Sequence, residues 1–285
     1  MIAWPEPLIL DLARRRAVLF LGAGVSCNSV GEGGMRPPTW REFLYKGFER
    51  CPGSKKHIKR LIKDKDFLTA CEIIKERMDE VWPNFLDELF VAPKYQPSEL
   101  HRSIYGLDAS LVLTPNFDKI YDNLAQSESN GTVRTKTYYD EGLADAVRGN
   151  SLNVMKVHGT IDNPNRMIFT RYEYLVARRK HPAFYTLLDA LIVTHTFLFI
   201  GCGLNDPDIR LFLEKSAQVH PDAAPHYITL PKVHSDIKGS IRRNLNLKVL
   251  AYSKKEDHKE LGDSLKDLVD LVDEKRMELA RTQRW

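Results

Sequence analysis

The segment VLFLGAGVSC, residues 18–27, decides the fold, because an apolar run in it leads directly into a glycine-rich turn. A turn of this kind lets backbone N–H groups approach a phosphate. Two common nucleotide-binding patterns do not fit it. The fingerprint G-x-G-x-x-G would need glycine at position 27, where Cys27 stands, and no Gly-Lys-Ser/Thr triplet occurs in the chain. The segment therefore predicts a buried strand followed by a ligand-binding turn of another type.

Five further apolar runs along the chain resemble the first. They are continuous rather than alternating, which is typical of strands in a parallel sheet covered on both faces. Helical patterns separate them, so we expect a doubly wound α/β fold with a parallel sheet. The predicted strands are Ala17–Leu21, Ser110–Thr114, Val154–Val157, Thr196–Ile200, His226–Thr229 and Leu247–Ala251.

A helical insertion interrupts this alternation. Thr39 and Glu42 have the spacing of a capping box, and the helical patterns that follow predict an inserted helical lobe at about residues 39–105. A last helix is expected at about 257–282, and one apolar face of it is expected to pack on the sheet. The alternative is that its charged end and Trp285 reach a neighbouring subunit. We expect residues 1–285 to form one domain with this insertion.

Composition excludes several classes of protein. The 285 residues are 43% hydrophobic and 28% charged, which is ordinary for a globular chain, and the net charge of +4 does not indicate direct nucleic-acid binding. No apolar run is long enough to span a bilayer and no secretory pattern is present, so we expect a cytoplasmic protein without membrane association. The cysteines are isolated, with no C-x-x-C pair, so we expect neither a structural zinc site nor a disulfide framework.

Polar and glycine residues follow the predicted strands at the positions where a doubly wound sheet binds ligands. Asn116 and Asp118 follow the second strand, His158 the third, and Gly201-Cys202-Gly203 the fourth. Each feature alone has a structural explanation, such as a helix cap, a hydrogen-bonded histidine or relief of crowding. Together they would line one crevice, which favours a functional interpretation.

In combination these motifs resemble the sirtuin (SIR2) family, and more closely its bacterial SIR2-like branch. The resemblance includes Pro38-Thr39-Trp40 after the first turn and the stretch GCGLNDPD from Gly201, and it extends over roughly residues 15–270. It implies a Rossmann-like sheet that binds NAD in an extended pose. The first turn would hold the pyrophosphate, and an asparagine and a histidine would face the nicotinamide ribose.

The chain lacks the two C-x-x-C pairs of the zinc ribbon found in sirtuin deacylases, so no groove for an acetyl-lysine peptide is expected. Resemblance to the zinc-free branch implies an NAD+ glycohydrolase that releases nicotinamide and ADP-ribose, in linear or cyclic form, in bacterial defence against phage. The expected catalytic residues are Asn116, His158 and Asp118, and no metal is expected. The residues expected to contact NAD are Gly22, Ala23, Gly24, Ser26, Thr114, Gly201, Gly203, Asn205 and Asp206.

Two other functions stay open at this point. One is a sensor that binds NAD or ADP-ribose without chemistry, and the other is a zinc-free NAD-dependent protein deacylase. An enzyme that depletes NAD needs restraint, so we expect a homo-oligomer or a separate partner protein. The resemblance implies a HerA-type ATPase or a short Argonaute as that partner.

Overall fold

A seven-stranded sheet forms the centre of the computed structural model, which describes residues 1–149, 152–204 and 207–283. Within those residues every pair of neighbouring strands runs parallel, as the apolar runs predict. The strands are β1 (Ala17–Leu21), β2 (Leu111–Thr114), β3 (Arg134–Thr137), β4 (Asn153–Lys156), β5 (Thr196–Ile200), β6 (His226–Pro231) and β7 (Leu247–Tyr252).

The α/β class is confirmed, and β1 and β5 have the predicted bounds. Strand β3 was not predicted. Its sequence, RTKT, has no apolar run, because β3 is an edge strand that pairs only with β4 and buries just Thr137.

The strand order is β3-β4-β2-β1-β5-β6-β7, so the chain leaves β1 in one direction and later returns to its other side. This reversal is a topological switch point, and ligands of such sheets bind outside the carboxyl ends of the strands beside it. β1 pairs in register with β5 over its whole length, from Ala17 opposite Thr196 to Leu21 opposite Ile200. The turns that follow β1 and β5 are therefore neighbours.

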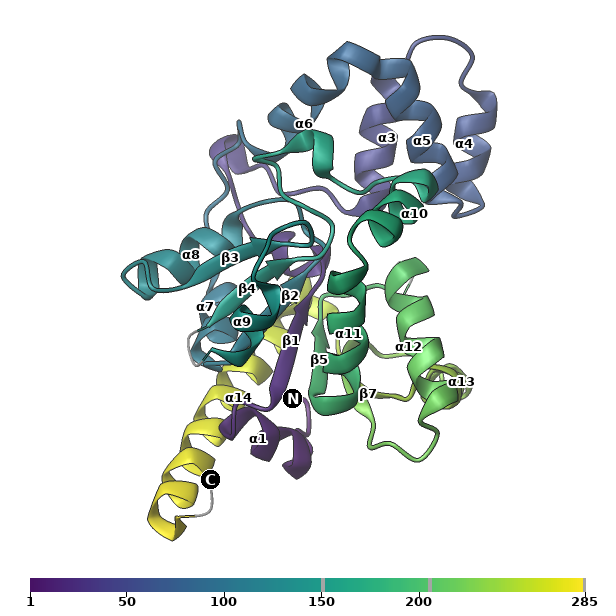
Figure 1. Cartoon of the computed structure of the whole chain (residues 1–285). Coiled ribbons are helices and arrows are strands. Elements are labelled where there is room, and N and C mark those ends of the chain that lie inside the picture. Colours follow the sequence, from purple (N-terminus) through teal and green to yellow (C-terminus); the bar gives the residue numbers. More distant parts are fainter. Residues whose placement is uncertain (150–151, 205–206, 284–285) are drawn as a thin grey trace.

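Helices cover both faces of the sheet (Figure 1). They are α1 (Glu6–Ala13), α2 (Ala23–Ser26), α3 (Trp40–Arg50), α4 (Lys56–Lys63), α5 (Phe67–Met78), α6 (Trp82–Phe90), α7 (Glu99–Gly106), α8 (Ile120–Glu128), α9 (Leu143–Arg148), α10 (Arg171–Lys180), α11 (Pro182–Thr194), α12 (Pro207–Val219), α13 (Ser235–Leu245) and α14 (Lys255–Thr282).

The side chains of β1 show why the strand reads as an unbroken apolar run. Ala17, Leu19 and Leu21 pack into one core with α1, α7, α8 and α14. Val18 and Phe20 point the other way, into a second core with α10 to α13. Because successive residues of a strand face opposite sides, a strand covered on both faces must be apolar throughout.

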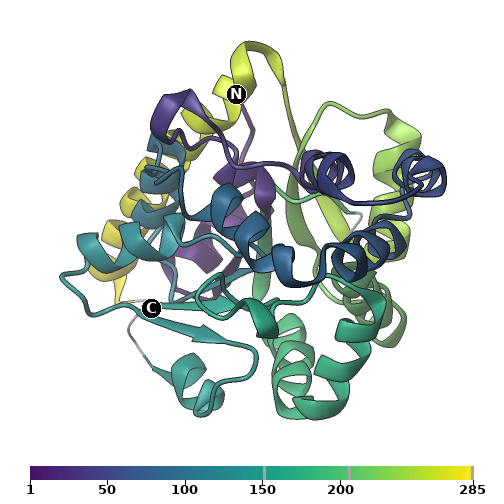
Figure 2. The ribbon, with the colours of Figure 1, turned by 90° about the horizontal axis from the view of Figure 1, so that it is seen from above.

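Helices α3 to α6, which we call the lobe, form most of a third core, to which Ile161, Met167 and Phe169 of the segment after β4 also belong. The capping box at the start of α3 is confirmed: Thr39 Oγ1 accepts the Glu42 N–H, and the Glu42 carboxylate accepts the Thr39 N–H at 2.8 Å. Seen from above, the lobe helices lie over the ends of the central strands (Figure 2). Helix α7, also expected within the insertion, packs against α14 and α8 instead.

Helix α14 packs as expected, since Leu261, Leu265, Leu268 and Val272 are all buried in the first core. It lies against α1 and α7. No helix among the described residues is both long and apolar enough to cross a membrane.

Candidate active site

A cavity of about 700 Å³ lies between the carboxyl ends of the strands and the lobe. Its size is within the range of small-molecule and cofactor sites. It is lined from the lobe by Trp40, Phe43 and Phe90, among others. From the sheet, the predicted site residues that line it are Gly22, Ala23, Gly24, Ser26, Asn116, Asp118, His158, Gly201 and Gly203. The turns after four different strands therefore meet in one cavity, as the sequence predicts.

The two glycine turns interlock at the floor of this cavity. The Gly22 N–H donates to the carbonyl of Ile200 and the Gly24 N–H to that of Gly201, each at 2.9 Å. A Cβ on Gly24 would lie 2.8 Å from the Gly201 oxygen, and Gly201 itself has a φ of +65°. The glycines are needed for this close approach, and the N–H groups of Gly22 and Gly24 are already used within the protein.

Asn116 is held by the first of these turns, the one that follows β1. Its Nδ2 donates to the Gly22 carbonyl and to Ser26 Oγ, each at 3.0 Å. A carboxamide has two N–H donors, so the side-chain donors are occupied and Oδ1 is the atom that can accept a hydrogen bond from a ligand or water. This orientation of the amide follows from its two acceptors.

Ser26 and Asp118 complete this network. The Ser26 hydroxyl donates its single proton to Asp118 Oδ2 at 2.8 Å, so it has no proton to offer a phosphate. Asp118 Oδ1 accepts the Ile120 N–H at 3.1 Å at the start of α8. The Asp118 carboxylate thus connects Ser26 of the first turn with the main chain at the start of α8.

Thr114 lies beneath the site rather than in it. It is 3% exposed and is not among the cavity-lining residues. Its hydroxyl donates to the Leu21 carbonyl at 2.7 Å and accepts the Asn116 N–H at 3.1 Å. Thr114 therefore connects the end of β1 to the Asn116 turn.

His158 follows β4 and its ring packs edge-on against Tyr174, with centroids 5.1 Å apart. Its carbonyl accepts the Ile168 N–H at 3.0 Å. Gly159 has a φ of +87°, and a Cβ there would lie 2.6 Å from the Arg166 carbonyl oxygen. The His-Gly pair therefore has a fixed backbone, because only glycine fits at the second position.

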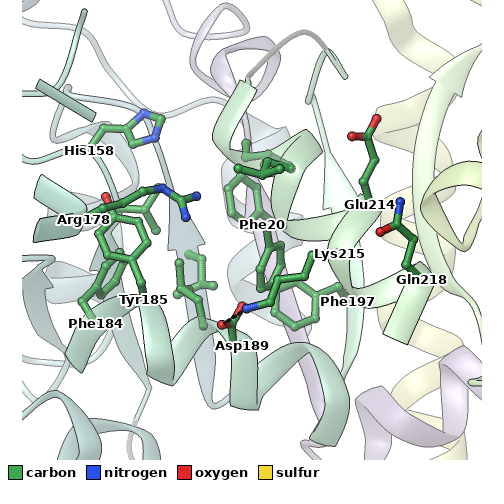
Figure 3. Close-up of a pocket in the computed structure, with 16 residues that line it drawn as sticks. Phe20, His158, Arg178, Phe184, Tyr185, Asp189, Phe197, Glu214, Lys215 and Gln218 are labelled. Carbon is green, nitrogen blue, oxygen red and sulfur yellow. Dashed lines mark hydrogen bonds and ion pairs between the residues drawn. The ribbon is translucent and has the colours of Figure 1, made fainter. Parts of the chain in front are cut away.

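A second cavity, of about 360 Å³, lies between α11 and α12. Figure 3 shows His158 at one end of it, and Asp189 of α11 and Lys215 of α12 forming an ion pair of 2.5 Å along another side. Its floor is made by core residues of the sheet, including Phe20, Leu113 and Phe197. The sequence did not indicate this cavity, because its lining residues have the pattern of an ordinary core.

Phe117, the middle residue of the Asn116 turn, points toward the lobe. Its ring lies 4.5 Å from that of Phe169 and 6.2 Å from that of Phe90, measured between centroids. Phe169 in turn stacks on Phe43 of α3 at 5.7 Å. The turn that carries Asn116 is thus in contact with the core of the lobe, which the sequence pattern did not indicate.

Burial raises the pKa of the Cys27 thiol to about 11, so at neutral pH this residue beside the first turn is a neutral thiol rather than a nucleophile. Among the described residues, no group of three or more histidine, cysteine or carboxylate side chains could hold a metal ion. Asn205 and Asp206, which the sequence motifs assigned to the nucleotide, lie outside the described residues.

Comparison with known proteins gives two kinds of match. A family model described as a SIR2-like domain matches residues 110–250. The chain is also 25% identical over 237 residues to the NAD(+) hydrolase ThsA of Acinetobacter baumannii (strain 532279), which covers 80% of this chain and 45% of that protein. It is 26% identical over 212 residues to defense-associated sirtuin 2 of Bacillus subtilis, covering 73% of this chain and 20% of the relative. The chain therefore spans less than half the length of these curated relatives.

Proposed function

We propose that this chain, which matches a SIR2-like family model over residues 110–250, is an NAD+ hydrolase that releases nicotinamide and ADP-ribose in bacterial defence against phage. The observation that carries this proposal is the convergence of Asn116 and His158 on one cavity with the glycine turns. The names of the relatives, an NAD(+) hydrolase and a defense-associated sirtuin, support it. We also propose that residues 1–285 act as one SIR2-like domain and that the reaction takes place in the cytoplasm.

In this reaction the bond between nicotinamide and the ribose C1′ breaks, and nicotinamide leaves with the electron pair. Positive charge develops at C1′, as in other glycosidic cleavages, and a water oxygen forms the new bond. His158 lines the cavity, and we propose it as the base that accepts the water proton. Asn116 Oδ1 is the acceptor that orients the water or a ribose hydroxyl, since both amide protons are held by the protein.

We assign Asp118, Ser26 and Thr114 to supporting roles around Asn116. Their polar atoms contact one another, Asn116 or the main chain, as described above. The pyrophosphate is proposed to lie against the turn Gly22-Ala23-Gly24. The adenosine end is proposed to lie beside Gly201 and Gly203, on the β5 side of the cavity, with Asn205 and Asp206 as further proposed contacts.

The direct test is incubation of purified protein with NAD+ and separation of the products by liquid chromatography. We expect nicotinamide and ADP-ribose in equal amounts, and loss of turnover in Asn116→Ala and in His158→Ala. Asn123→Ala and His220→Ala are matched controls, because both residues are exposed and neither lines the cavity. Tight NAD+ binding by calorimetry with no product under any activating condition would identify a sensor instead.

Regulation is proposed to act through the lobe, which lies over the cavity and contacts the Asn116 turn through Phe117. Subunit contacts in a homo-oligomer, or a partner such as a HerA-type ATPase or a short Argonaute, would bias the position of the lobe and so limit access to the site. Light scattering during dilution, paired with NAD+ turnover, tests this. A monomer with full activity at every concentration and without a partner would contradict it.

A further inference from the structure

Lys156 is buried beside the candidate active site without lining its cavity. It is the last residue of β4, two residues before His158, and pairs in register with Thr114 of β2. Its side chain is 1% exposed. An ammonium group is expensive to bury unless it is paired and hydrogen-bonded, so its partners require an explanation.

The ammonium of Lys156 has two partners on the segment that follows β2. It donates to the backbone carbonyl of Asp118. It also forms an ion pair with Asp122 of α8, with Nζ 3.1 Å from Oδ2. Asp122 is itself buried, and burial raises the pKa of its carboxyl while the neighbouring Lys156 lowers it. Lys156 thus ties β4 to both the Asn116–Asp118 turn and α8.

A continuous series of hydrogen bonds leads from this pair to Asn116. Lys156 fixes the main chain of Asp118, whose carboxylate accepts the Ser26 hydroxyl at 2.8 Å. Ser26 Oγ accepts one of the two amide protons of Asn116 at 3.0 Å. The rotation of the Asn116 amide, and hence the direction of Oδ1, therefore depends in part on Ser26 Oγ, the acceptor that this series connects to Lys156 and Asp122.

Stability alone does not account for the pair. Replacing a buried ion pair by apolar residues of similar volume is often neutral or stabilising, so an apolar pair would serve the core equally well. What an apolar pair cannot do is hold the Asp118 carbonyl by a directed hydrogen bond. We propose that Lys156 and Asp122 are positioning residues that set the orientation of the Asn116 side chain for NAD+ cleavage. This inference rests on the proposed function.

The first test is kinetic. In the double variant Lys156→Met/Asp122→Leu we expect a cooperatively folded protein with a somewhat lower melting temperature, because the Asp118 carbonyl loses a donor. We expect its KM for NAD+ to stay close to that of wild type and its kcat to fall roughly a hundredfold through misplacement of Asn116. Adding Asn116→Ala to the double variant should lower kcat no further than Asn116→Ala alone. Lys275→Met is the control, because Lys275 is a half-buried, ion-paired lysine on α14, away from the cavity. An unchanged kcat in the double variant would overturn the inference. So would a triple variant in which the kcat losses of the double variant and of Asn116→Ala multiply.

A second test does not depend on turnover. With ¹⁵N-labelled asparagine, the Asn116 side-chain NH₂ should give two resonances protected from solvent exchange in the wild type. Both the double variant and Asp122→Asn, which removes only the charge, should lose this protection while other asparagines keep theirs. Unchanged exchange in both variants would overturn the positioning role. A wild type that shows the protection but does not hydrolyse NAD+ would contradict the proposed function and leave the positioning role standing.

Discussion

Asn116 Nδ2 donates a hydrogen bond of 3.0 Å to the carbonyl oxygen of Gly22, 94 residues earlier in the chain. The bond joins the turn after β2 to the turn after β1, and the second amide proton goes to Ser26 of the same first turn. The asparagine is therefore a structural tie as well as a site residue. Substitutions that remove its donors and substitutions that remove its oxygen should have separable effects.

Asn116→Asp keeps both the shape of the side chain and an oxygen at Oδ1, but removes both donors and adds a charge beside Asp118. A carboxylate facing the Gly22 carbonyl and Ser26 cannot keep the present orientation, so we expect kcat to fall by about a hundredfold. Steady-state kinetics with NAD+ measures this. Asn123→Asp makes the same change at an exposed position of α8 and should leave kcat unaltered. Equal kcat in the two variants would contradict the role given to the amide donors.

Ser26→Ala and Ser29→Ala form a matched pair, since both serines are buried. Ser26 Oγ bridges Asn116 and Asp118, and its removal leaves a partly buried amide donor and a buried carboxylate oxygen without these partners. We expect the free energy of unfolding to fall by about 1–3 kcal/mol. Ser29 Oγ has no hydrogen-bond partner among the described residues, so Ser29→Ala should be neutral or slightly stabilising. Urea unfolding followed by circular dichroism distinguishes the two, and a reversed order would refute this account of the network.

Gly24→Ala should separate the two interlocked turns. The new Cβ would lie 2.8 Å from the Gly201 carbonyl oxygen, a backbone atom that cannot rotate away. We expect a lower melting temperature and weaker NAD+ binding by calorimetry. Gly262 of α14 provides the opposite case, because no atom lies within 4 Å of the position that a Cβ would take there. Gly262→Ala should raise the free energy of unfolding by up to about 1 kcal/mol. A lower free energy of unfolding in this variant would contradict a regular helix at this position.

Most of this architecture could be predicted from the sequence, because the strands are covered on both faces and so read as apolar runs. The Asn116, His158 and Gly201 turns could be located from their places after strands. The directions of individual hydrogen bonds could not be predicted from the sequence. Thr114 and Ser26 are ordinary polar residues there, and only the three-dimensional contacts show which oxygen accepts each hydroxyl proton. Lys156 lies within the predicted strand Val154–Val157, but the sequence did not show that its side chain is buried and paired. Its partner Asp122 is near it only after folding.

Stability should depend on pH through His226. Burial lowers its pKa from 6.5 to about 4, so between these values the unfolded chain binds a proton that the folded chain does not. The free energy of unfolding should therefore fall as pH drops from 6.5 toward 4, by about 1.4 kcal/mol per pH unit for this group. His226→Asn should flatten this slope, since an amide oxygen can still accept the Phe197 N–H that Nδ1 accepts now. Exposed His220→Asn is the control, and the same slope in both variants would exclude His226 as its source.

The interlocked turns at Gly24 and Gly201 also determine when, during synthesis on the ribosome, the site first exists. The turn at Gly24 is translated within the first thirty residues. The turn at Gly201, which completes the same side of the cavity, follows β5, far along the chain. Contacts so distant in sequence form only after the intervening chain has emerged. If the chain has the proposed function, a nascent chain has no assembled active site. NAD+ cleavage can then begin only after translation has passed β5.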